Sequence, residues 1–120
     1  MNNNYEKIII SDQAQSKEYQ GQSLKGKHIV IEGSDFKTEL EKLENCIVEG
    51  GLIHCQSTYN CKFLGTEKLL AEKLEFSVFE NCNKIQVGNR DFNNKVYTSQ
   101  FFNCNTISIT DSDQDVPDTY

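Results

Sequence analysis

Residues 79–87 read FENCNKIQV, and residues 101–109 read FFNCNTISI. Both segments place an aromatic residue, an Asn-Cys pair and two apolar β-branched residues at the same spacing. The Asn-Cys pair occurs four times, at intervals of 15, 21 and 22 residues: Asn45-Cys46, Asn60-Cys61, Asn81-Cys82 and Asn103-Cys104. A feature that recurs in this way indicates a repeat protein, in which each repeat forms one structural unit.

Alignment on the asparagine reveals further shared positions, most of them β-branched, aromatic or small and apolar. Apolar positions two residues apart place side chains on one face of a strand. Weaker copies of the pattern occupy residues 5–12 and 27–33. We therefore predict an all-β fold, a single-domain right-handed parallel β-helix (β-solenoid) of five to six coils, each of about 20 residues. The aligned positions two before, four after and six after the asparagine are Leu43, Thr58, Phe79 and Phe101; Glu49, Leu64, Ile85 and Ile107; Gly51, Thr66, Val87 and Ile109.

In this fold the asparagines stand at corners, because asparagine tolerates a left-handed backbone and its amide bonds to neighbouring groups. The cysteines that follow them point inward as a ladder of small apolar side chains. We predict that these thiols resist reagents in the native state and that four further residues are buried: Phe76, Phe79, Ile85 and Val87.

Two segments also fit an amphipathic helix, and they open an alternative α+β fold. Residues 66–74 carry Leu69, Leu70 and Leu74 on one helical face, and residues 35–43 have similar spacing. The repeat pattern runs through both segments, which favours strands with one short inserted helix.

The length of 120 residues corresponds to one domain. We predict a β-helix domain over residues 1–110 and an acidic disordered tail over 111–120, which holds four of the eighteen acids. The longest aliphatic runs, 8–10 and 29–31, fall far below the roughly 20 apolar residues of a membrane-spanning helix. The N-terminus lacks the features of a signal peptide, so we expect a cytoplasmic protein with reduced thiols.

The charge balance bears on the choice of partner. Twelve basic and eighteen acidic residues give a net charge of −6, and Arg90 is the only arginine. This composition argues against direct binding of nucleic acid, which relies on clustered lysine and arginine. It favours a protein partner with a basic surface, reached by electrostatic attraction.

The possible catalytic and metal constellations are poorly spaced. His54, Cys55 and Cys61 do not match the usual spacing of zinc ligands, and neighbouring residues such as His54 and Cys55 face opposite sides of a strand. Cysteines in an interior ladder lack the lowered pKa of a nucleophile. We therefore predict no enzyme activity, no catalytic residues, no metal and no cofactor.

The coil length and the recurring Asn-Cys pair, over residues 24–110, resemble the β-helix domains of tubulin-folding cofactor C and of the C-terminal part of cyclase-associated protein. The resemblance implies a β-helix fold. The cofactor C family stimulates GTP hydrolysis through an arginine in a Gln-x-Arg arrangement. The segment Gln86-Val87-Gly88 lacks that arginine, so the resemblance does not extend to this activity.

The sequence thus predicts a non-catalytic protein-binding module: an acidic inhibitor or immunity-type protein, in the style of phage or bacterial mobile elements, that mimics nucleic acid on a basic partner surface. The alternative is a structural β-helix that self-assembles as a homo-oligomer, since exposed strand edges can pair between chains. The candidate binding residues are the densest run of acids and three aromatic residues expected to be exposed: Glu32, Asp35, Glu39, Glu41, Glu44, Tyr59, Tyr97 and Phe102.

Overall fold

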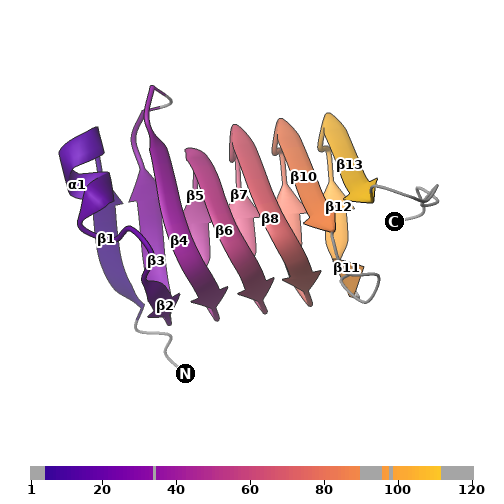
Figure 1. The fold of residues 1–120 in the computed structure, drawn as a ribbon, viewed down its shortest axis with the longest axis horizontal. Coiled ribbons are helices and arrows are strands. Elements are labelled where there is room, and N and C mark those ends of the chain that lie inside the picture. The colour runs from indigo at the N-terminus through magenta and orange to yellow at the C-terminus, as the bar shows by residue number, and fades with distance from the viewer. Residues whose placement is uncertain (1–4, 34, 90–95, 98, 112–120) are drawn as a thin grey trace.

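The computed structural model describes residues 5–33, 35–89, 96–97 and 99–111. It shows a mostly β protein, a parallel β-solenoid of about four turns with one short helix (Figure 1). The first of its two sheets contains, in spatial order, β1 (Glu6–Ile10), β3 (Lys27–Ile31), β5 (Ile47–Glu49), β7 (Lys62–Leu64), β9 (Val78–Glu80) and β12 (Gln100–Phe102). The second contains β2 (Ser23–Lys25), β4 (Lys37–Glu44), β6 (Leu52–Tyr59), β8 (Lys68–Glu75), β10 (Lys84–Asn89) and β13 (Thr106–Asp111), with β11 (Val96–Tyr97) also paired to β8. The helix is α1 (Gln13–Lys17).

The predicted fold class is confirmed, whereas the number and length of the coils differ from the prediction. Register partners in the first sheet are 15 residues apart between Val48 and Phe63, 16 between Phe63 and Phe79, and 22 between Phe79 and Phe101. The central coils are therefore shorter than predicted. Residues 5–12 resemble a full repeat in sequence, but after β1 they lead into α1 rather than around a coil.

The four Asn-Cys pairs occupy two different corners of the solenoid, not one as the alignment implied. Asn45 and Asn60 follow the long strands β4 and β6, whereas Asn81 and Asn103 follow β9 and β12 of the other sheet. All four asparagines have a left-handed backbone, with φ between 53° and 56°. Both corners need a left-handed residue followed by a small inward side chain, so the same dipeptide suits both places.

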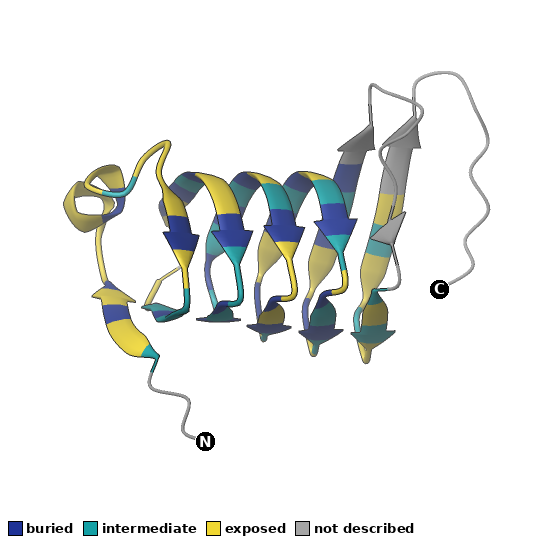
Figure 2. Ribbon diagram, turned by 90° about the horizontal axis from the view of Figure 1, so that it is seen from below, coloured by how far each residue is buried: buried dark blue, intermediate teal, exposed yellow. Residues whose placement is uncertain are grey.

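Inward-facing side chains of the two sheets form the core (Figure 2). The rings of Phe63, Phe79 and Phe101 stack along the first sheet, with centroids 4.8 and 5.0 Å apart. Ile85 and Val87 are fully buried in the second sheet. The predicted burial of Phe79, Ile85 and Val87 is confirmed. The predicted burial of Phe76 is wrong, because 47% of this residue is exposed.

The two segments with helical spacing are strands. In β4 the buried positions are Thr38, Leu40 and Leu43, and the same steps of two and then three residues recur in β6 and β8. The step of three lies where each long strand bends between two inner faces, and the register omits Glu41 and Gln56 at this bend. A bent strand thereby produces the spacing of three that also marks a helix, so the helical alternative fails.

The helix α1 lies elsewhere and covers a strand edge that β2 leaves free. β2 pairs only with the last three residues of β4. Alongside the first part of β4, the buried Ser16 hydroxyl donates a hydrogen bond to the Lys37 carbonyl at 3.0 Å, and the Gly21 amide bonds to the Glu39 carbonyl at 3.0 Å. The helix and its following turn therefore protect a strand edge from pairing with another chain.

Candidate protein-binding surface

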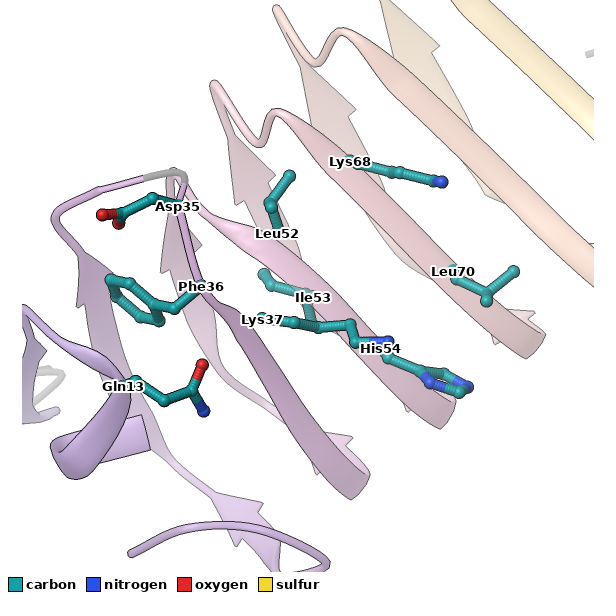
Figure 3. A pocket seen from close by; sticks show the side chains of 9 residues that line it. All are labelled: Gln13, Asp35, Phe36, Lys37, Leu52, Ile53, His54, Lys68 and Leu70. Carbon is teal, nitrogen blue, oxygen red and sulfur yellow. The ribbon is translucent and has the colours of Figure 1, made fainter. Parts of the chain in front are cut away.

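The outer face of β4, β6 and β8 carries a hollow of roughly 480 Å³ beside α1 (Figure 3). Its apolar lining includes Phe36 and the outward side chains Leu52 and Leu70, and its polar lining includes Asp35 and His54. The hollow lies against the early residues of the three long strands, close to the loop that joins β3 to β4. Its lining comes from adjacent strands of one sheet, so the surface is rigid.

The strand register explains this mixture of residues. One outward row contains Lys37, Leu52 and Lys68, and the next contains Glu39, His54 and Leu70. Leu52 and Leu70 are only half-buried although they lie among charged neighbours. Apolar groups that remain accessible on an otherwise polar sheet face are typical of a place where a partner side chain packs.

The predicted acidic residues lie mostly along this face without forming a continuous acidic patch. Asp35 lines the hollow, Glu39 points outward from β4, Glu41 is exposed at the strand bend, and Glu44 ends the strand. Glu32 lies beyond β3, where its carboxylate accepts a hydrogen bond from the Ser11 hydroxyl at 2.9 Å.

Two interactions modify this acidic run. The Glu39 carboxylate accepts a bond from the Gln20 amide at 3.4 Å and lies 3.6 Å from the Lys37 ammonium. Lys37 and Lys42 stand between the acids of β4 in the chain. The strand therefore alternates in charge, so its local field is weaker than a purely acidic row would produce.

The predicted aromatic residues do not lie together. Tyr59 ends β6 and is 39% exposed, and Phe102 ends β12 on the other sheet and is 50% exposed. The backbone of Tyr97 lies in β11, and its side chain is outside the described residues. Phe76, which sequence reasoning placed in the core, contacts Tyr59 instead: the ring centroids are 5.7 Å apart at an interplanar angle of 81°. A signal was present, because Phe76 replaces the asparagine expected after β8.

No group of three or more His, Cys, Asp or Glu side chains in the described part of the chain is placed to hold a metal ion. His54 points outward while Cys55 is fully buried, so the two do face opposite sides of β6. On the other sheet, His28 Nε2 lies 2.7 Å from Glu49 Oε2 in a half-exposed pair. Among residues 5–33, 35–89, 96–97 and 99–111, no helix is long and apolar enough to cross a bilayer.

Four thiols are enclosed in the core, but Cys104 is only half-buried. Burial raises the pKa of Cys55 to about 12 and that of Cys82 to about 11. The Cys61 thiol forms a hydrogen bond that lowers the pKa of Cys46, whereas the same bond and burial raise the pKa of Cys61. The neutral thiol of Cys55 stabilises the fold below pH 9, and this contribution is lost as the pH rises from 9 toward 12.

This burial predicts selective labelling of the native protein. We expect one thiol, Cys104, to react with a chromogenic disulfide reagent at pH 8, and the other four to react only after unfolding in denaturant, because burial keeps them protonated and inaccessible. Cys104→Ser should remove the fast phase. Fast release of all five thiols from the native protein would contradict the interior placement of the cysteines.

No protein-family model matches this chain, and no curated protein or solved structure is significantly similar to it. The resemblance to the β-helices of cofactor C and cyclase-associated protein is therefore supported only as far as the β-solenoid fold.

Proposed function

We propose that this chain is a non-catalytic protein-binding module that docks through the outer face of β4, β6 and β8. The observation that carries the proposal is the hollow beside α1, where Leu52 and Leu70 remain accessible on a rigid sheet and Asp35 lies at their side. A partner side chain that packs there covers apolar surface at little cost in ordering, because the ladder is already rigid.

The charge of the chain indicates the kind of partner. A net charge of −6 attracts a basic protein surface and accelerates encounter with it. We propose that the module occupies such a surface and so inhibits its partner, in the manner of an acidic nucleic-acid mimic or an immunity protein. The resemblance to cofactor C adds no catalytic role to this proposal, because Gln86-Val87-Gly88 lacks the arginine of that family.

A triple charge reversal tests the docking face. The partner is first captured from a native-host lysate at low salt, and its association is then measured by surface plasmon resonance over a range of salt concentrations. We expect Asp35→Lys, Glu39→Lys and Glu41→Lys together to lower the association rate constant by roughly tenfold and to flatten its salt dependence.

The matched control reverses Glu6, Glu49 and Glu80 to lysine, which changes the net charge equally on the other sheet. A single variant, Leu70→Asp, probes the hollow, and we expect it to raise the dissociation rate constant because it places a charge against the apolar contact. If both triple variants slow association equally, only the net charge matters and the docking face is wrong. Unchanged kinetics in all variants would reject the proposal.

Self-assembly is a second candidate because both sheets end in parallel strands, β1 at one end and β12 with β13 at the other. Stacking of such ends would extend both sheets between copies. α1 covers part of one end, which opposes stacking. Size-exclusion chromatography separates the candidates: elution as a monomer across a wide range of concentrations supports the binding module, and concentration-dependent growth supports assembly.

A further inference from the structure

One corner of the solenoid contains a residue that its backbone conformation does not favour. Gly26, Asn45, Asn60 and Phe76 directly follow β2, β4, β6 and β8. Their φ angles are 66°, 55°, 54° and 52°, so every coil turns this corner in the left-handed region. Glycine and asparagine enter that region readily, whereas a phenylalanine there is strained because its Cβ crowds the following carbonyl group.

Phe76 gains little in return from packing, since 47% of it is exposed. It also interrupts an amide ladder. The Asn60 side-chain amide donates a hydrogen bond to the Asn45 side-chain oxygen at 2.7 Å, and an asparagine at position 76 would be placed to extend that ladder by one coil. A strained and exposed aromatic residue in place of a favourable one indicates a role at the surface.

The surroundings of Phe76 indicate what its ring recognises. Its contact partner, Tyr59, has Glu44 and Glu75 as register neighbours on the two adjacent strands, at the strand spacing of about 4.8 Å. Two half-exposed aromatic rings thus lie beside two carboxylates. A cation is attracted both to the face of an aromatic ring and to a carboxylate, so the two kinds of group favour the same ligand.

The two carboxylates are available to such a ligand. Glu75 Oε2 lies 3.9 Å from Lys73 Nζ, which is longer than a hydrogen bond. The Glu44 side chain makes no ion pair with any residue that the structure describes, although Lys25 is its register neighbour on β2.

We propose that Glu44, Tyr59, Glu75 and Phe76, which we name the aromatic corner, bind an arginine side chain of the protein partner. Arginine fits better than lysine because its planar guanidinium stacks on a ring while it bonds in a bidentate way to a carboxylate. This inference rests on the proposed function, since it supplies the partner chemistry for docking on a basic surface. It adds a contact at the far end of the long strands from the hollow.

The test uses two defined probes, an arginine-rich peptide and a lysine-rich peptide of equal length and charge, at about 0.15 M salt to screen diffuse attraction. Binding is followed by nuclear magnetic resonance titration of the backbone amides. We expect the arginine peptide to bind more tightly and to shift the signals of the aromatic corner most. Phe76→Asn should weaken that binding on the order of two- to fivefold, the effect of one exposed cation–π contact.

The same variant has a second readout. Phe76→Asn should raise the unfolding temperature, because it relieves the left-handed strain, so stability and binding change in opposite directions. A purely structural Phe76 would lose stability without selective loss of arginine binding. Phe102→Asn is the matched control, because it removes a similarly exposed aromatic from the other sheet, and we expect it to leave peptide binding unchanged.

Three outcomes overturn the inference: equal affinity of both peptides, unaltered arginine binding in Phe76→Asn, or chemical-shift changes centred away from the aromatic corner. Its failure can be told apart from failure of the proposed function. If Phe76→Asn leaves partner affinity unchanged while the Asp35, Glu39 and Glu41 reversals slow association, the docking face stands and only the arginine site is rejected.

Discussion

Ile85→Asp is expected to prevent folding under native conditions. Ile85 is fully buried in β10, in register with Leu69 of β8 on one side and Ile107 of β13 on the other. A carboxylate at this position has no cationic partner and no water, and burying such a charge costs several kcal/mol, on the order of the whole stability of a small domain. Circular dichroism should show loss of the β signal.

The neighbouring Lys84→Asp is the control for Ile85→Asp. Lys84 is exposed on the same strand, so the same carboxylate there remains hydrated. We expect this variant to keep the native spectrum, with a change in unfolding free energy within about 0.5 kcal/mol. A folded Ile85→Asp protein with native-like spectra would show that the inner column of the second sheet is wrongly placed.

Phe79→Ala is expected to lower the unfolding free energy by about 3–5 kcal/mol. Phe79 is fully buried between two stacked rings, 4.8 Å from Phe63 and 5.0 Å from Phe101 between centroids. Removal of the middle ring leaves a cavity that neighbouring coils close only with difficulty, because their backbones are held in register by the ladder. Urea unfolding followed by circular dichroism measures the loss.

Phe102→Ala provides the comparison for Phe79→Ala, since Phe102 is the exposed aromatic of the neighbouring strand β12. We expect Phe102→Ala to change the unfolding free energy by less than about 0.5 kcal/mol. Equal losses in the two variants would contradict the stacked interior.

The two corners illustrate how far a repeat can be interpreted from sequence. The Asn-Cys pairs correctly predicted a solenoid because any corner of this kind needs a left-handed residue and a small inward neighbour. They misassigned the coils because Asn60 and Asn81 satisfy the same local requirement at opposite corners. Local chemistry specifies the conformation of a corner, but it does not distinguish one corner from the other.

Part of the candidate surface was accessible in the same way. Alternation along each strand indicated that Glu39 and Tyr59 face outward. It did not pair Tyr59 with Phe76, because that contact depends on the register of β6 against β8 and their residues are 16 positions apart at this point of the chain. The hollow beside α1 combines Leu52, Leu70 and Asp35 from three segments, so no single stretch contains its pattern.

Strand periodicity, asparagine corners and inward apolar columns were all determined locally, because each depends on the conformational preference or transfer free energy of one residue and its near neighbours. The stacking register, the position of α1 over the edge of β4 and the exposure of Phe76 were decided by the tertiary structure. These features arise when separate coils compete to cover the same edges and faces, and that competition depends on contacts between residues 15 to 22 positions apart.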